Sequence, residues 1–272
     1  MTKTILITGA SSGLGRATAE VFHARGWNVI ATMRMPSNET APQHLERMLV
    51  VRLDVQDEES IRTAVDAAID RFGRVDVLVN NAGYGAYGPL EATPVAKMLL
   101  QFDVNVMGLL ATTHALLPHF RNQRSGTIIN VSSMGGRIAF PLGALYHGTK
   151  FAVEGISESL QYELAPLGVA VKLVEPGFMK TDFAGRSLDM SNDKRLTQYQ
   201  PLVQSMMGAL GAMAEHAGGP QHVADTIYQA ATDGTDRLRY AAGADAQQFI
   251  TTRLATDDAR FFAGVRAQFG LA

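Results

Sequence analysis

The chain has 272 residues, of which 46% are hydrophobic and 18% are charged, and this charged share lies below the roughly 25% of an average soluble domain. Twenty-four Lys and Arg against 26 Asp and Glu leave a formal net charge of −2, without the basic excess that binding to a nucleic-acid backbone requires, so we expect no nucleic-acid partner. The chain has no Cys, which excludes disulfides, thiolate nucleophiles and thiolate metal sites, and we expect a folded cytoplasmic protein.

Short apolar runs alternate along the chain with segments of helical periodicity. We predict strands at residues 3–8, 28–32, 48–53, 75–79, 126–131 and 169–174. We predict helices at residues 16–25, 58–72, 95–121, 146–165 and 221–232. The stretch from Met98 to Phe120 is largely apolar, but it is interrupted well short of the ~20 apolar residues that a membrane span needs. The interrupting residues are Gln101, Asp103, Asn105, His114 and Pro118. We therefore expect a buried helix there and no membrane partner.

This alternation predicts the fold class. Short, almost fully apolar strands separated by helices indicate a parallel sheet covered on both faces, that is, a doubly wound α/β (Rossmann) fold of three αβα layers. No linker or repeat divides the chain, so we expect residues 1–272 to form a single domain. Residues 182–219 are rich in Met and Gly with weak periodicity, and we interpret them as a helical excursion that covers a substrate pocket. Residues 244–272 are expected to form a C-terminal extension.

The sequence Thr8-Gly-Ala-Ser-Ser-Gly-Leu-Gly15 stands between the first predicted strand and the first predicted helix. Small side chains let backbone approach a pyrophosphate, and the first N–H groups of the helix are unpaired donors with a favourable dipole. We therefore predict a dinucleotide at this turn. A glycine-rich turn without a ligand is the alternative, because the spacing differs from the more general G-x-G-x-x-G. The residues predicted to bind the dinucleotide here are Gly9, Ser11, Ser12, Gly13, Leu14 and Gly15.

The end of the second predicted strand bears on the choice of cofactor. Dinucleotide-binding folds usually place an acidic residue there, about 20 residues past the glycines, to accept a hydrogen bond from the ribose 2′-OH. This chain has Arg34 instead. Because a guanidinium suits the 2′-phosphate of NADP(H), we predict NADP(H) over NAD(H). A solvated loop arginine is the alternative.

Tyr146 and Lys150 open a predicted helix, and their four-residue spacing puts the phenol and the ammonium on one face. A phenol with its ordinary pKa of ~10 is a poor base at neutral pH, but a nearby ammonium and an oxidised nicotinamide stabilise its phenolate. Ser132 and Ser133 follow the strand 126–131, where a hydroxyl can hydrogen-bond a substrate carbonyl oxygen. These residues favour general acid/base catalysis by Tyr146, although each taken alone also fits a structural role.

Together, these motifs resemble the short-chain dehydrogenase/reductase family. The resemblance covers residues 3–181 and rests on Thr8–Gly15, Asn80-Asn81-Ala82-Gly83, Asp103-Val104-Asn105-Val106, Ser133, Tyr146-x-x-x-Lys150 and Pro176-Gly177. It implies a nicotinamide-dependent oxidoreductase with the catalytic tetrad Asn105, Ser133, Tyr146 and Lys150. It implies Ser133 rather than Ser132 because the family's serine-to-tyrosine interval of thirteen residues equals 146 − 133.

The resemblance also implies roles for individual residues. In similar enzymes the Tyr transfers the proton, the Ser polarises the carbonyl, the Lys lowers the pKa of the phenol and holds the nicotinamide ribose, and the Asn positions a water in the proton relay. Gly148-Thr149 stands where the family often has Ala-Ser, and we expect little effect because both pairs are small. The further cofactor contacts that the resemblance implies are Asp54 and Val55 at the adenine, Asn81, Ala82 and Gly83 along the central wall, Thr181 at the carboxamide, and Tyr146, Lys150, Pro176 and Gly177 in the same site.

The predicted function is that of an NADP(H)-dependent carbonyl reductase or alcohol dehydrogenase acting on a small molecule. Two alternatives stay open: an NAD(H)-linked dehydrogenase of a hydroxy compound, and a non-catalytic NADP(H)-binding regulator that senses redox state. His114 and His119 lack the spacing of a zinc site, so we expect no metal. Apolar and aromatic residues hint at a bulky apolar ketone; they are Tyr84, Tyr87, Phe140, Leu142, Phe178, Phe183, Met206, Met207, Leu210 and Met213.

The helices at 95–121 and 146–165 are too apolar for burial on one side only. Phe151, Val153, Ile156 and Leu160 are spread around much of the second helix. We therefore predict self-association, and the family resemblance implies a homodimer or homotetramer through these helices.

Overall fold

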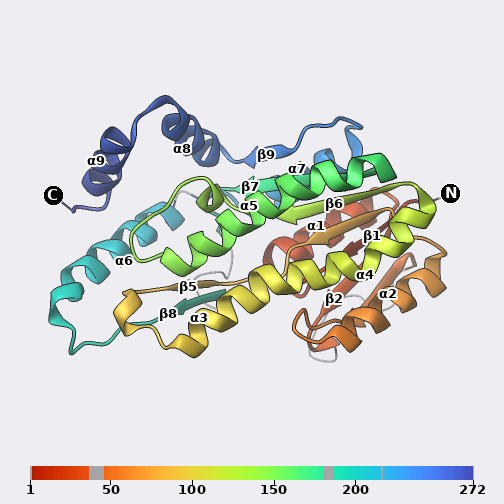
Figure 1. Cartoon of the computed structure of the whole chain (residues 1–272), viewed down its shortest axis with the longest axis horizontal. Coiled ribbons are helices and arrows are strands. Elements are labelled where there is room, and N and C mark those ends of the chain that lie inside the picture. The colour runs from red at the N-terminus through yellow and green to blue at the C-terminus, as the bar shows by residue number, and fades with distance from the viewer. Residues whose placement is uncertain (1, 37–45, 181–186, 216, 272) are drawn as a thin grey trace.

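The computed structural model describes residues 2–36, 46–180, 187–215 and 217–271. Its centre is a seven-stranded sheet in the order β3-β2-β1-β4-β6-β7-β9 (Figure 1), and every neighbouring pair is parallel. The predicted doubly wound α/β fold is thus confirmed. The strands are β1 (Thr4–Ile7), β2 (Asn28–Met33), β3 (Met48–Arg52), β4 (Val77–Asn80), β6 (Gly126–Val131), β7 (Val169–Pro176) and β9 (Arg239–Ala242).

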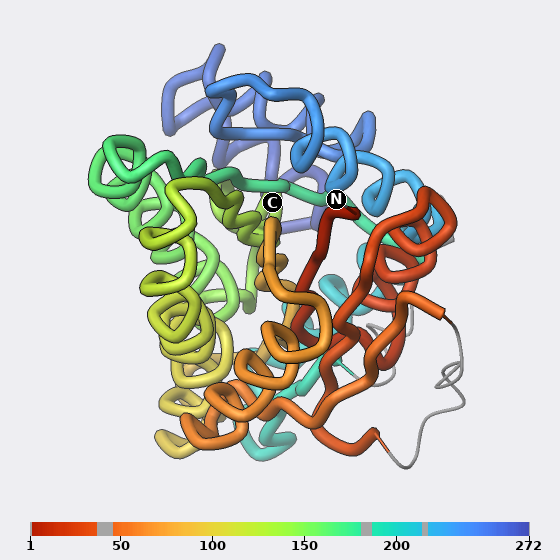
Figure 2. The backbone as a smooth tube through the Cα atoms, turned by 90° about the vertical axis from the view of Figure 1, so that its right-hand side faces the viewer, coloured from red at the N-terminus to blue at the C-terminus, as the bar shows by residue number. Residues whose placement is uncertain are grey.

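Helices cover both faces of the sheet (Figure 2). Because side chains alternate between the faces of a strand, Ile5 and Ile7 pack against one helical layer and Leu6 against the other. The first layer consists of α1 (Gly13–Ala24) and α7 (Gln221–Thr232). The second consists of α2 (Glu58–Phe72), α4 (Gly108–Gln123) and α5 (Ala144–Leu164).

Capping residues set the ends of some of these helices at the predicted positions. The α2 helix begins after Asp57, whose carboxylate accepts a hydrogen bond from the Ser60 N–H at 3.1 Å, as expected of an N-cap. It ends at Gly73, which adopts a φ of 75°, a left-handed conformation that glycine takes without steric cost. Residues 58–72, 126–131 and 221–232 have the predicted bounds.

The region beyond residue 180 differs from the prediction. Among the described residues of the expected excursion 182–219, α6 (Gln200–Glu215) is the one long helix, and β8 (Leu188–Met190) pairs in parallel with β5 (Gly85–Tyr87) in a second, two-stranded sheet. The expected helical excursion is therefore part strand. The sequence analysis also missed β9, a four-residue strand without a clear alternating pattern. The C-terminal residues form α8 (Ala244–Ala255) and α9 (Asp258–Gln268).

The predicted helix 95–121 consists of α3 (Val95–Phe102), a π-helical turn (Asp103–Met107) and α4. Within the described residues, Val95–Gln123 is the one helix long and apolar enough to cross a membrane, and 33% of its most apolar window is buried in the chain. The expectation of a buried helix is thus wrong for much of its length, because the outer face of α3 contacts solvent.

Candidate active site

The glycine-rich turn lies at the carboxyl end of β1 and leads into α1. Gly9 has a φ of 66° and Gly13 a φ of 53°, which glycine tolerates best. A Cβ on Gly15 would lie 2.2 Å from the carbonyl oxygen of Gly9, so no larger residue fits there. Ser12, the N-cap of α1, makes no side-chain capping bond, which leaves the first N–H groups of the helix directed at the turn. This cradle fits a pyrophosphate.

The segment after β4 holds the glycine-rich turn in place. The Thr8 hydroxyl oxygen accepts hydrogen bonds from the N–H groups of Asn81 and Ala82, both at 3.0 Å. The Asn81 side-chain amide donates to the carbonyl oxygens of Thr8 and Gly9 at 2.9 and 3.1 Å. Asn81, predicted as part of the cofactor wall, therefore fixes the turn through its own side chain.

Other predicted cofactor residues line the same edge of the sheet. Arg34 follows β2 directly and is exposed, and no ion pair among the described residues involves it. Asp54 follows β3, where its carboxylate accepts a hydrogen bond from the Gln56 N–H at 3.1 Å. Val55 packs against α4 so closely that a Cβ on Gly108 would lie 2.6 Å from it. These positions suit contacts along one extended dinucleotide.

Ser133 and Tyr146 meet at the carboxyl end of β6. Their side chains are hydrogen-bonded, and this bond opposes the effect of burial, which raises the pKa of the Tyr146 phenol above its ordinary value. The Ser133 hydroxyl oxygen also accepts a hydrogen bond from the Gly135 N–H at 3.0 Å, which orients it. The phenol is therefore protonated at neutral pH and suited to donate a proton.

Lys150 lies one helical turn beyond Tyr146 and is buried. Its Nζ donates to the carbonyl oxygen of Val131 at 2.8 Å and lies 5.8 Å from the centroid of the Tyr146 ring. Burial lowers the pKa of Lys150 to about 8, and the charge of Glu154 partly opposes that effect. The family resemblance implies that Lys150 lowers the pKa of Tyr146. In the structure, burial is the largest influence on the Tyr146 phenol, and it raises the pKa.

Asn105 lies in the π-helical turn between α3 and α4, a distortion often found at functional sites. Its side-chain oxygen accepts a hydrogen bond from the Tyr84 N–H at 3.0 Å. Its amide donates to the Tyr84 carbonyl oxygen at 2.9 Å and to the Thr149 hydroxyl at 3.1 Å. Asn105 thus joins the loop after β4 to the helix that carries Tyr146, and its part in a water relay stays a prediction.

Comparison with known proteins agrees with this geometry. The pattern of the short chain dehydrogenase family matches residues 3–192, about 70% of the chain. The chain belongs to this family. An uncharacterized oxidoreductase of Schizosaccharomyces pombe is 45% identical over 239 residues, which cover 88% of this chain and 100% of the relative. A 3-ketodihydrosphingosine reductase of Bacteroides thetaiotaomicron is 44% identical over 179 residues, 66% of this chain and 65% of that protein.

Solved structures of similar proteins share the fold. A short-chain dehydrogenase from Streptomyces avermitilis superposes with a TM-score of 0.84 and 35% identity, covering 100% of this chain and 99% of that one. One from Burkholderia cenocepacia in complex with NADP has a TM-score of 0.77 and 27% identity over 97% of both chains. One from Burkholderia phymatum in complex with NAD has a TM-score of 0.77 and 26% identity over 93% and 92%. This short-chain dehydrogenase is therefore an NAD(P)-dependent oxidoreductase.

His147 is a residue of the dehydrogenase site to which the sequence analysis gave no role. Its buried ring accepts a hydrogen bond from the Phe140 N–H at Nε2, 3.0 Å away, so its Nδ1 carries the proton and donates to the Gly135 carbonyl oxygen at 2.9 Å. Burial lowers the pKa of His147, so the ring stays neutral. His147 thus connects the loop that follows Ser133 to α5. In the sequence, its position between Tyr146 and Lys150 is the one signal of this role.

The loop after β7 completes the edge of the sheet. The Gly177 N–H donates to the Ala242 carbonyl oxygen at 3.0 Å, and a Cβ on Gly177 would lie 2.2 Å from the Asp245 carboxylate. That carboxylate also accepts the Phe178 N–H at 2.7 Å. Asp245, in the first turn of α8, was missed because β9 was missed. Thr181, predicted to contact the carboxamide, lies outside the described residues.

An aromatic cluster lies beside the catalytic face of the dehydrogenase. The Tyr87 ring lies tilted by 31° against the Tyr146 ring with centroids 5.5 Å apart, and Phe140 contacts Phe178 and Phe249 at 6.1 and 5.3 Å between centroids. Helices α6, α8 and α9 pack on this cluster (Figure 1). Of the predicted methionine stripe, Met206 is buried in the cluster while Met207 is exposed. Phe183 lies outside the described part of the chain.

Proposed function

We propose that this dehydrogenase is an NADP(H)-dependent carbonyl reductase that interconverts a ketone and a secondary alcohol. The observation that carries the proposal is the hydrogen bond between the hydroxyls of Ser133 and Tyr146, with the Lys150 ammonium 5.8 Å from the phenol ring. These three groups stand at the same sheet edge as the glycine-rich turn, where a substrate carbonyl and a dinucleotide would meet.

The chemistry follows from the state of each group. A nicotinamide dinucleotide held by the glycine-rich turn and Lys150 would supply the hydride for the carbonyl carbon. Ser133 donates a hydrogen bond to the carbonyl oxygen, which polarises the C=O bond. Tyr146 is protonated because burial raises its pKa, and it gives its proton to the same oxygen as negative charge develops there. Lys150 then stabilises the phenolate that remains. One hydride and one proton are consumed for each carbonyl reduced.

The preference for NADP(H) rests on Arg34. Its exposed guanidinium follows β2, beside the position of the ribose 2′ substituent in this fold class. A 2′-phosphate would gain a charge-assisted, bidentate partner there, whereas the described residues at the end of β2, Met33–Pro36, offer the 2′-hydroxyl of NAD(H) no acidic side chain. The NADP complex of one structural neighbour supports this assignment. Another neighbour is in complex with NAD, so the test must measure both cofactors.

The substrate class follows from the apolar surroundings of Tyr146. Tyr87, Phe140 and Phe178 belong to, or pack against, one aromatic cluster on the catalytic side. Such walls desolvate an alkyl or ring system while the hydroxyls hold its oxygen. The similarity to a 3-ketodihydrosphingosine reductase, whose name denotes a long-chain ketone, agrees with a bulky apolar ketone.

The test is turnover of a ketone panel followed by NADPH and NADH absorbance. We expect oxidation of NADPH with long-chain or polycyclic ketones and at least tenfold weaker use of NADH. Faster turnover of a hydroxy compound with NAD would favour the NAD(H)-linked alternative. Tight NADPH binding without turnover of any carbonyl or alcohol would favour the redox-sensing regulator.

A further inference from the structure

A group of paired charges lies behind the catalytic face, with Glu154 and Glu175 as its buried members, and the proposed reaction does not use it. Glu175 on β7 forms an ion pair with Arg137 at 3.1 Å. Arg239 on β9 pairs with two carboxylates of α5, with Glu154 at 2.9 Å and with Glu158 at 2.7 Å. Burying a charge costs free energy even when the charge is paired, so hydrophobic packing does not explain why these carboxylates are present.

Glu154 connects this group to the catalytic lysine. It lies one turn beyond Lys150 on α5, a spacing that places both side chains on one face of the helix. The short 3₁₀ turn Met134–Gly136 packs over both residues, because a Cβ on Gly136 would lie 2.9 Å from the Glu154 Cγ and 3.0 Å from the Lys150 carbonyl oxygen. Glu154 is thus confined under this turn, on the helix face that carries Lys150.

The charged and titratable groups around the Lys150–Glu154 segment come from several elements. Tyr146 and the neutral His147 precede it on α5, Arg137 follows the 3₁₀ turn, Glu175 lies on β7 and Arg239 on β9. Among these, Glu154 supplies the charge that opposes the effect of burial on Lys150. One oxygen of Glu154 has no hydrogen-bond partner, while the other is held by Arg239.

We infer that Glu154 is a positioning residue for Lys150: its buried carboxylate, which lies on the same helix face and is held by Arg239, keeps charged the lysine whose Nζ donates to the carbonyl oxygen of Val131. This inference rests on the proposed function in one respect, because Lys150 matters for turnover only if Tyr146 and Lys150 carry the reaction. The charge state of Lys150 itself can be measured without any turnover.

Glu158 provides the matched control. It also lies on α5 and also pairs with Arg239, so it tests whether the Arg239 contact alone matters. Its side chain is 53% exposed, against 7% for Glu154. Solvent screens an exposed charge, so Glu158→Gln should leave Lys150 unaffected.

The experiment is an NMR titration of the free protein labelled with carbon-13 at lysine Cε, with the Lys150 signal identified by its loss in Lys150→Arg. The wild-type midpoint is expected near the Lys150 pKa of about 8. Glu154→Gln should lower it by about one unit, the lower end of the effect of a nearby opposite charge. An unchanged midpoint in Glu154→Gln, or an equal shift in Glu158→Gln, would overturn the inference.

A second variant covers the case in which Glu154→Gln does not fold because Arg239 loses a buried partner. The double variant Glu154→Gln/Arg239→Gln removes both charges, which folded proteins tolerate better than one unpaired charge. It should show a downward shift that is smaller than in Glu154→Gln, because loss of the Arg239 cation raises the lysine pKa. The high-pH limb of kcat/KM should move with the NMR midpoint. If the midpoint shifts while Lys150→Arg retains full turnover, the proposed function fails and the electrostatic inference stands.

Discussion

The carbonyl oxygen of Gly9 lies 2.2 Å from the point that a Cβ on Gly15 would occupy. The two glycines belong to successive parts of the glycine-rich turn, so this approach sets the shape of the cradle. We expect Gly15→Ala to push the turn open and weaken NADPH binding by at least tenfold, since backbone cannot yield as a side chain can. NADPH fluorescence titration measures the loss.

Gly155→Ala is the control for this change. Gly155 lies on α5 with no atom within 4 Å of its Cβ position, and alanine favours a helix over glycine by up to about 1 kcal/mol. We expect equal or higher thermal stability and unchanged NADPH affinity. Wild-type affinity in Gly15→Ala would show that the turn does not hold the cofactor.

Tyr146→Phe removes the proton donor while keeping the ring. We expect turnover to fall by about 10²–10⁴-fold, the usual contribution of a general acid, with NADPH affinity retained. Tyr87→Phe is the matched variant, because its ring lies 5.5 Å from that of Tyr146 and its hydroxyl has no part in the proposed proton transfer. Steady-state kinetics with the best ketone measure both, and similar losses in the two variants would contradict the assignment.

Arg34→Ala tests the basis of the cofactor preference. Loss of one charge-assisted hydrogen-bonding group costs about 1.5–3 kcal/mol, so NADPH affinity should fall by about 10–100-fold while NADH affinity changes little. Arg62→Ala is a suitable control, since Arg62 lies on α2 and pairs with Glu59 there. Parallel titrations with the two cofactors give the result, and an equal loss for both would reject the role of Arg34.

The sequence predicted the sheet, and it named the candidate catalytic residues that the structure brings together, because both signals are local. Apolar strands such as 126–131 and the four-residue step from Tyr146 to Lys150 need no knowledge of distant residues. The doubly wound topology follows because parallel strands joined by helices have few arrangements. Even the choice of Ser133 over Ser132 agrees with the placement of its hydroxyl against Tyr146.

Features that depend on distant contacts escaped the sequence analysis. β5 and β8 are three residues each and exist because they pair with one another across the chain. Asp245 reaches the loop after β7 only because β9 brings α8 to that edge. The raised pKa of Tyr146 depends on desolvation by surrounding elements, which a sequence does not display.

Lys172 and Asp233 make the fold sensitive to acid. The Lys172 side chain is 4% exposed, and its Nζ lies 2.7 Å from the Asp233 carboxylate, which also accepts a hydrogen bond from the Tyr240 hydroxyl. These bonds hold the pKa of Asp233 below its ordinary value. A depressed carboxyl pKa stabilises the fold above the unfolded pKa of about 3.9, and that stability is lost as the pH falls through the folded pKa.

Asp233→Asn should therefore lower the free energy of unfolding at pH 7 by about 3 kcal/mol, because it leaves a buried ammonium without its counter-charge. The difference from wild type should shrink as the pH falls below about 4. Asp225→Asn, which breaks the exposed pair with Arg25, should cost less than about 1 kcal/mol. Urea unfolding at several pH values compares them, and equal costs for the two variants would contradict a buried role for Asp233.

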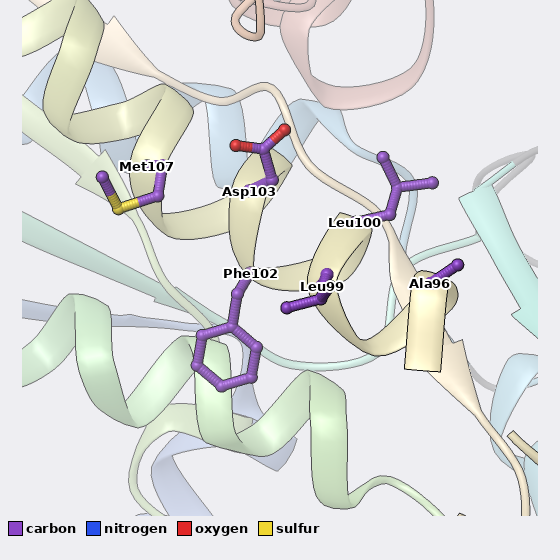
Figure 3. A pocket seen from close by; sticks show the side chains of 6 residues that line it. All are labelled: Ala96, Leu99, Leu100, Phe102, Asp103 and Met107. Atoms are coloured by element: carbon purple, nitrogen blue, oxygen red, sulfur yellow. The ribbon is translucent and has the colours of Figure 1, made fainter. Parts of the chain in front are cut away.

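The outer face of α3 carries an apolar groove that we propose as the contact between copies of the chain. Figure 3 shows the residues that line it, which are Ala96, Leu99, Leu100, Phe102, Asp103 and Met107. The groove runs onto α5, where the Phe102 ring approaches Gly148 and Phe151 is exposed. A monomer would leave this contiguous apolar face in water.

Leu99→Glu should shift the mass measured by light scattering at micromolar concentration from dimer or tetramer toward monomer, since it places a charge where apolar surfaces would meet. Leu254→Glu on α8 is the control: Leu254 is 72% exposed and Leu99 67%, so the two substitutions differ in location rather than in exposure. A wild-type protein that is monomeric under these conditions, or equal dissociation by both variants, would reject the α3 face as the interface. Because Asn105 and α5 lie directly behind this face, loss of the partner should also reduce turnover.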